Sequence, residues 1–216
     1  MRTGNLIWWS GLALLAWSAL PARAELSAWE VLNRALAVTE QVQDYTANCT
    51  FSAELPGQDT LTRQFGVYFK RPDQLRVDSD SVVLVPREAL TFGDLRRHLN
   101  QDMDASLAGV GSLGEEAVYS IKLKPRDENR PDRLLVWIRS GNWTPTRTEI
   151  WRGETQMVQL WWSFALIADQ YWMPTGLTAH VPSGILSPEG PVTVRLGWQD
   201  YQVNTGLSDD LFTSQQ

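Results

Sequence analysis

The sequence of 216 residues has little of what catalytic and metal sites are usually built from. Its one cysteine, Cys49, cannot form a disulfide within the chain. The only histidines are His98 and His180, whereas a zinc site needs three or four ligands at suitable spacing, so we expect no metal. The formal net charge of −6 argues against nucleic-acid binding, which needs a basic face.

Other patterns associated with catalysis also fail on context. Residues 109–114 match the letters of a dinucleotide fingerprint, but that motif needs a strand before it and a helix after it, so we interpret them as a flexible connector. Asp102 and Asp104 could form a carboxylate pair for acid–base catalysis, but residues two apart point in different directions on a helix, which favours a solvated acidic face. Cys49 lies on the apolar side of its expected strand, which favours a buried, inert thiol. We therefore expect no cofactor and no enzymatic activity.

Long apolar runs are also missing, except at the N-terminus. Leu6–Leu20 is almost wholly apolar, begins after Arg2, and is followed by the small-x-small triplet Ala22-Arg23-Ala24. The run covers about 15 residues, fewer than the roughly 20 that span a bilayer as a helix. We interpret residues 1–24 as a cleavable signal peptide, with an uncleaved membrane anchor as the alternative.

The mature protein, residues 25–216, is then expected to be one exported domain. Glu25 stands where a lipidated cysteine would have to be, so we expect no lipid anchor.

A helix should open this domain. Ser27 and Glu30 have the spacing of a capping box. The apolar residues that follow recur at helical spacing and predict that one side of the helix covers an apolar surface: Ala28, Val31, Leu32, Ala35, Leu36, Thr39 and Val42.

Period-two alternation then predicts about nine antiparallel strands joined mostly by short turns. They cover residues 45–55, 65–69, 75–78, 117–124, 134–139, 145–151, 156–164, 171–181 and 192–203. In the last strand Tyr201 and Val203 fall out of step with Val192–Trp198, and a bulge near Gln199 would restore the register. Residues 86–114 differ: Phe92, Leu95, Leu99 and Met103 keep helical spacing, which predicts a helical insertion with a glycine-rich tail.

Tryptophan is abundant after the signal peptide: Trp29, Trp137, Trp143, Trp151, Trp161, Trp162, Trp172 and Trp198. Trp161 and Trp162 are adjacent and must point to opposite faces of a strand. A sheet that is apolar on both faces must cover both or present one to a ligand or partner. The pattern alone leaves ordinary core packing and a lipid-binding cavity both open.

The stretch Phe65–Arg76, with its Lys70-Arg71-Pro72 step between two strands, resembles the signature of the LolA-type lipoprotein carriers. Tyr45-Thr46-Ala47 after the first helix, Leu123-Lys124-Pro125 and the ending Leu211-Phe212 resemble other parts of that family. The glycine turn and aromatic strand usual in the carriers are missing after Ser79, which indicates a divergent relative.

This resemblance implies an α+β fold: a strongly curved antiparallel sheet, or incomplete β-barrel, with an N-terminal helix and a helical insertion as lid. Its concave face would hold acyl chains of lipids or lipoproteins. The resemblance implies that Arg71 latches the lid by hydrogen bonds to backbone, and a guanidinium fork suits several free carbonyls at once. Leu75 would lie at the cavity mouth. Phe51, Phe69, Val77 and Trp137 complete the expected site.

The expected function is therefore a periplasmic carrier of lipids or lipoproteins, monomeric, with transient membrane-protein partners. The alternative is an envelope sensor or regulator that binds a membrane protein. A hydrolase is disfavoured by the missing nucleophile and metal patterns.

Overall fold

One curved antiparallel sheet makes up most of the protein. The computed structural model describes residues 26–80, 85, 90, 103–127 and 129–213. In these ranges the elements are α1 (Ala28–Glu40), β1 (Asp44–Glu54), β2 (Leu61–Lys70), β3 (Gln74–Asp78), β4 (Met103–Leu113), β5 (Glu116–Pro125), β6 (Asp132–Arg139), β7 (Pro145–Arg152), β8 (Thr155–Ile167), β9 (Tyr171–Val181), β10 (Val192–Val203) and α4 (Asp210–Thr213). No helix in these ranges is both long enough and apolar enough to cross a membrane.

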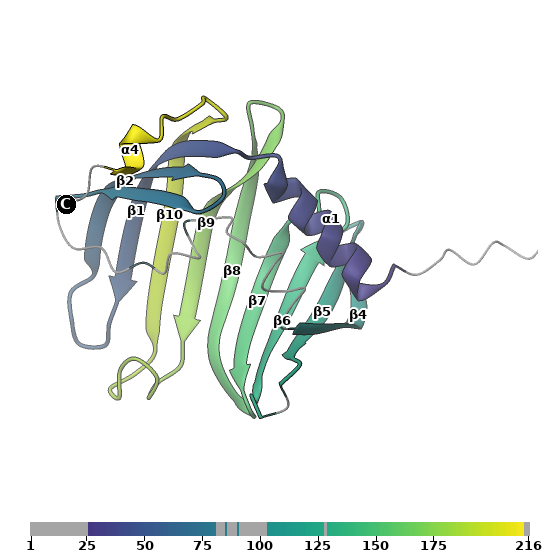
Figure 1. The fold of residues 1–216 in the computed structure, drawn as a ribbon. Coiled ribbons are helices and arrows are strands. Elements are labelled where there is room, and N and C mark those ends of the chain that lie inside the picture. Colours follow the sequence, from purple (N-terminus) through teal and green to yellow (C-terminus); the bar gives the residue numbers. More distant parts are fainter. Residues whose placement is uncertain (1–25, 81–84, 86–89, 91–102, 128, 214–216) are drawn as a thin grey trace, which may run out of the picture.

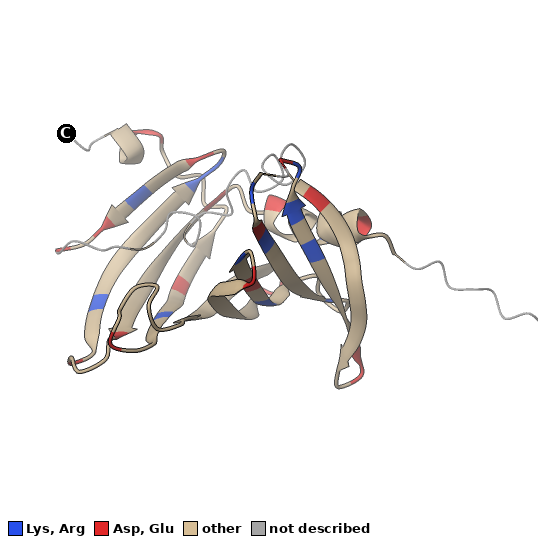
Figure 2. Ribbon diagram, turned by 90° about the horizontal axis from the view of Figure 1, so that it is seen from below, with Lys and Arg blue, Asp and Glu red and all other residues tan. Residues whose placement is uncertain are grey.

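The sheet is an incomplete barrel. Its ten strands, as described, lie in the order β3-β2-β1-β10-β9-β8-β7-β6-β5-β4, and the two end strands do not pair with each other. Seen from below, the sheet bends sharply into two walls (Figure 2). The predicted fold class is confirmed. The predicted signal peptide and, apart from Leu90, residues 86–102 of the predicted helical insertion lie outside the described residues.

The prediction for residues 103–114 was wrong, because Met103–Leu113 is a strand and not a helix end with a flexible tail. The segment alternates with a period of two: Ala105 pairs with Leu123 and Leu107 with Ile121 of β5. Gly114, with φ of +63°, makes the tight turn between the two strands. The helical spacing that ended at Met103 concealed this period, and Gly109 and Gly111 belong to an edge strand.

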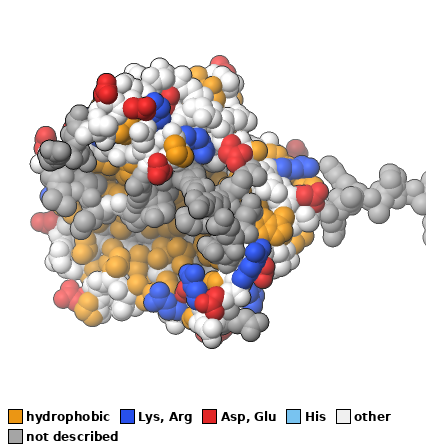
Figure 3. All heavy atoms as spheres, in the orientation of Figure 1, with side chains coloured by type: hydrophobic (Ala, Val, Ile, Leu, Met, Phe, Trp, Pro, Cys, Tyr) orange, Lys and Arg blue, Asp and Glu red, His pale blue; other side chains and the backbone are white. Residues whose placement is uncertain are grey.

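The cross-strand register defines one continuous inner face. Tyr45 pairs with Phe69 and Cys49 with Trp198, while Leu177 pairs with both Leu196 and Trp162. Further along the same face, in β5–β7, Ile150 pairs with Leu134 and Val136 pairs with Ile121. These apolar side chains share one face from β2 to β5. Figure 3 shows hydrophobic side chains gathered in the hollow of that face.

Helix α1 crosses the inner face on the side of β4–β6 (Figure 1). The predicted capping box is present, with the Ser27 hydroxyl accepting from the Glu30 amide and the Glu30 carboxylate accepting from the Ser27 amide. The helix buries Ala28, Val31, Leu32 and Leu36 against Ile121, Leu123 and Ile138. Each fully buried valine or leucine contributes about 1.5–3 kcal/mol. The predicted apolar side of α1 is therefore the side that packs on the sheet.

The predicted bulge in the last strand is confirmed. Thr46 pairs with Gln202 but Asn48 pairs with Gln199, so β10 carries one residue more than β1 in this interval. Asp200 takes a left-handed conformation with φ of +56°. The extra residue returns Tyr201 and Val203 to the inner face, where both pack against buried neighbours.

Replacing Asp200 tests this geometry. Asp200→Val should lower the free energy of unfolding by about 1–2 kcal/mol, because a β-branched residue is disfavoured in the left-handed region. Asp200→Gly should be more stable than Asp200→Val, because glycine adopts this conformation without steric strain while both variants lose the hydrogen bond from Asn48 Nδ2 to the Asp200 carboxylate. Urea unfolding measures both, and equal stabilities of the two variants would contradict the assigned bulge.

Candidate functional site

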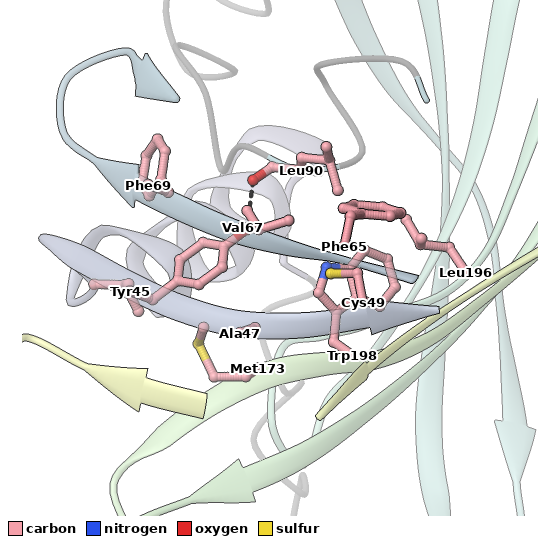
Figure 4. Packing of buried hydrophobic residues seen from close by; sticks show 11 residues of the cluster. Tyr45, Ala47, Cys49, Phe65, Val67, Phe69, Leu90, Met173, Leu196 and Trp198 are labelled. Carbon is pink, nitrogen blue, oxygen red and sulfur yellow. Dashed lines mark hydrogen bonds between the residues drawn. The ribbon is translucent and has the colours of Figure 1, made fainter. Parts of the chain in front are cut away.

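Two clusters of buried side chains cover the two ends of the inner face. The α1 cluster consists of Ala28, Val31, Leu32, Leu36, Ile121, Leu123 and Ile138. The β1–β2 cluster consists of Val42, Tyr45, Ala47, Cys49, Phe65, Val67, Phe69, Leu90, Met173, Leu196 and Trp198 (Figure 4). Leu90, from the segment between β3 and β4, is 3% exposed in this cluster.

Between the clusters lies an apolar surface that is only half-buried. Ile150 pairs with Val158 across β7 and β8, and Leu160 pairs with Ala179 across β8 and β9. All four are of intermediate exposure and belong to neither cluster. We call these four residues the central strip. None carries a charge or a polar side chain, so the strip suits a hydrocarbon chain.

Arg71 lies at the corner where α1 meets the sheet. Its Nε donates to the Val42 carbonyl at 2.7 Å and its guanidinium nitrogen to the Thr39 carbonyl at 2.9 Å. Its own backbone amide donates to the Gln43 carbonyl at 2.8 Å. The fork therefore holds carbonyls at the C-terminal end of α1, which fits the donor geometry expected from the sequence. A role of Arg71 toward a ligand stays a prediction.

The same corner holds the C-terminal segment. Lys70 Nζ donates to the Leu207 carbonyl at 2.7 Å, and Arg76 donates to the Leu211 carbonyl at 3.2 Å. The carboxylate of Asp44, which is 4% exposed, accepts from the amides of Thr205 at 2.8 Å and of Gly206 at 3.0 Å. Sequence reasoning missed Asp44, and its position where helical spacing changes to strand alternation was the only local signal.

A buried hydroxyl connects the sheet to Leu90. Tyr45 Oη donates to the Leu90 carbonyl at 2.5 Å (Figure 4). Burial raises the pKa of Tyr45 far above its ordinary value, so the hydroxyl keeps its proton and remains a donor. Burial likewise raises the pKa of Cys49 to about 12, so its thiol is protonated and a poor nucleophile. Sequence reasoning placed Tyr45 on the apolar face but did not identify this bond.

Four of the remaining expected site residues lie on the inner face. Phe69 is fully buried in the β1–β2 cluster. Phe51, Leu75 and Val77 are partly buried and pack against the same cluster. The structure thus brings these four side chains together, on the same wall as Arg71. Their contact with a ligand remains a prediction.

Trp137 lies on the opposite, outer face. Its neighbours Val136 and Ile138 pack with the α1 cluster, so strand alternation turns Trp137 away from it. The Arg147 guanidinium stacks 4.8 Å from the Trp137 ring and 5.6 Å from the Trp161 ring. Trp137 therefore does not line the hollow, and period-two counting along β6 was the signal that would have excluded it.

The outer face has its own polar centre at Glu149, which is 5% exposed. Burial raises the pKa of Glu149, but hydrogen bonds from Gln159 and Trp151 and the charge of Arg147 outweigh burial and hold the pKa below its usual value. Glu149 is thus an ionised group paired with Arg147 and not a candidate acid catalyst. Among the described residues, no group of His, Cys, Asp and Glu is arranged to hold a metal ion.

Tyr45→Phe tests the link to Leu90. Removing the hydroxyl leaves a buried carbonyl without this donor, which should lower the free energy of unfolding by about 1–3 kcal/mol. Tyr68→Phe is the matched control, because Tyr68 points to the other face of the neighbouring strand, and it should cost less than about 0.5 kcal/mol. Equal losses in urea unfolding would show that the Tyr45 hydroxyl has no special role.

Comparison with solved structures shows the fold. A LolA superfamily protein from Nitrosomonas europaea is 16% identical, with a TM-score of 0.58 over 88% of this chain and 98% of its own. A DUF1329 family protein from Desulfovibrio piger is also 16% identical, with a TM-score of 0.63 over 87% and 97%. A domain described as an outer membrane lipoprotein-sorting protein, from Vibrio parahaemolyticus, is 15% identical, with a TM-score of 0.62 over 86% and 96%.

Sequence comparison is less informative about activity. No curated protein matches the chain. A family model described as "Uncharacterized protein" matches residues 87–216, which is more than half of the sequence. The chain therefore belongs to that family, and it folds as the LolA superfamily proteins do.

Proposed function

We propose that this protein is a periplasmic carrier that holds acyl chains of a lipid or lipoprotein on the inner face of its sheet. The observation that carries the proposal is the central strip, an uncharged apolar surface that is left half-buried between two well-packed clusters. A contiguous apolar surface of this kind in a concave site is typical of a ligand-binding pocket.

The energetics fit a lipid with long chains. Burying one methylene contributes about 0.8 kcal/mol, so about ten buried methylenes contribute roughly 8 kcal/mol. Association costs about 4–15 kcal/mol in lost freedom, which a single short chain would not offset. A ligand with two or three acyl chains would bind tightly, and weaker binding of single-chain lipids is expected.

The fold and the expected export to the periplasm also support the proposal. One solved structure with this fold is described as a lipoprotein-sorting domain. A signal peptide over residues 1–24, followed by Glu25 in place of a lipidated cysteine, would release the mature protein to diffuse between membranes. A carrier needs this freedom and needs no catalytic group. We propose a monomer that meets membrane proteins only transiently.

Bound lipid tests the proposal directly. Protein purified gently from the periplasm of a bacterial host should carry phospholipid or lipoprotein that native mass spectrometry detects. Repeated preparations without lipid would contradict the carrier, and a stoichiometric membrane protein in place of lipid would support a sensor instead.

The role of Arg71 can be tested by the rate of ligand release. Arg71→Leu removes the donors to the Thr39 and Val42 carbonyls, so the end of α1 should loosen and a fluorescent phospholipid should leave about threefold to tenfold faster. Arg76→Leu is the control, because Arg76 bonds the C-terminal segment and not α1.

Circular dichroism must show that both variants remain folded. An unchanged release rate in folded Arg71→Leu, or an Arg71→Leu variant that only unfolds, would assign Arg71 a structural role alone. An equal acceleration in Arg76→Leu would mean that the whole corner, and not the α1 contact, controls release.

A further inference from the structure

Trp198 carries a buried donor that has no acceptor. Its side chain lies in the β1–β2 cluster and the residue is only 4% exposed. The indole Nε1 is inaccessible to solvent and has no hydrogen-bond partner. Buried polar groups nearly always have a partner, and leaving one without is unfavourable, so this donor calls for an explanation.

The side chains around Trp198 do not supply an acceptor of ordinary strength. Figure 4 shows Trp198 among Cys49, Phe65 and Leu196. Phe65 and Leu196 have no polar atom, and a protonated thiol is a weak acceptor. The two tyrosine hydroxyls of this part of the inner face are directed at backbone carbonyls and not at Trp198. The Tyr201 hydroxyl donates to the Pro174 carbonyl at 2.6 Å, and the Tyr45 hydroxyl donates to Leu90.

An apolar path connects Trp198 to the central strip. Leu196, two residues before Trp198 on β10, pairs with Leu177 of β9, which in turn pairs with Trp162 of β8. Leu177 and Trp162 are only partly buried. Leu160 of the central strip lies two residues before Trp162 on the same face. A chain lying on the strip therefore runs along apolar side chains up to the neighbourhood of the free donor.

We propose that Trp198 is the polar anchor of the inner-face site, and that its Nε1–H donates to the carbonyl oxygen of an acyl ester or acyl amide. Such a carbonyl is the acceptor that an acyl lipid carries next to its hydrocarbon chain. The ligand class is then acyl lipids, in preference to hydrocarbons and ether lipids with the same chains. The inference rests on the proposed function and adds a specificity-determining residue to it.

The test compares ligands that differ only in the carbonyl. Vesicles of dioleoylphosphatidylglycerol and of its dialkyl ether counterpart are incubated with the mature protein, and the lipid retained after removal of the vesicles gives the relative affinity. The wild type should prefer the ester about threefold to tenfold, the range expected for one hydrogen bond. In 15N-labelled protein, the Trp198 indole N–H resonance should move downfield with the ester and not with the ether.

A second ligand pair distinguishes the sources of the carbonyl. A synthetic peptide with a diacylglyceryl cysteine is compared with its dialkylglyceryl form. A preference for the ester in the phospholipid pair assigns the anchor to free phospholipids. A preference in the lipopeptide pair alone assigns it to lipoproteins. Either result supports Trp198 as the anchor.

Matched variants isolate the indole N–H. Trp198→Phe keeps an aromatic ring but no donor, so it should bind ester and ether forms equally. Trp161→Phe makes the same change on the outer face, beside Arg147, and should keep the preference. If wild-type protein binds ester and ether forms equally, the anchor is wrong while the carrier proposal stands. If neither form of either pair binds, the proposed function itself fails.

Discussion

The structure depends on covering one apolar face of an open sheet. The strands β3 and β4 at its ends do not meet, so curvature alone cannot shield the inner face from water. Helix α1 covers the side of β4–β6, and the cluster that includes Leu90 covers β1 and β2. The strands β7–β9 between them keep apolar side chains half-buried. Leaving this apolar surface partly uncovered is unfavourable, but it also leaves the surface accessible to the proposed ligand.

The second constraint is the corner formed by Lys70, Arg71 and Asp44. Three separate parts of the chain meet there: the end of α1, the turn after β2 and the segment after β10. Each contact pairs a charged side chain with backbone groups, and the charge makes these bonds stronger than bonds between neutral groups. The corner thereby fixes the end of α1 and the C-terminal segment to the turn after β2.

The elements whose sequence follows a single periodicity were predicted correctly. The capping box indicated the start of α1, and period-two alternation indicated most strands and the bulge at Asp200. The prediction was wrong where two periodicities overlap, since Met103 fits both a helical run and an edge strand. The site was predictable only in part. Side-chain alternation placed Phe51, Phe69, Leu75 and Val77 on the inner face, where they lie, but Trp137 needed strict counting along its strand. The contacts of Tyr45 and the unsatisfied donor of Trp198 depend on pairings between distant strands, which no local pattern contains.

Adjacent residues on opposite faces give the most direct test of the account. Trp161 is 37% exposed on the outer face, beside Arg147 and His180, whereas Trp162 packs toward the inner face. In a 15N-labelled protein loaded with phospholipid that carries a nitroxide on one acyl chain, paramagnetic broadening should be strong at the Trp162 indole and weak at Trp161. Stronger broadening at Trp161, or none at either indole in lipid-loaded protein, would contradict acyl-chain binding on the inner face.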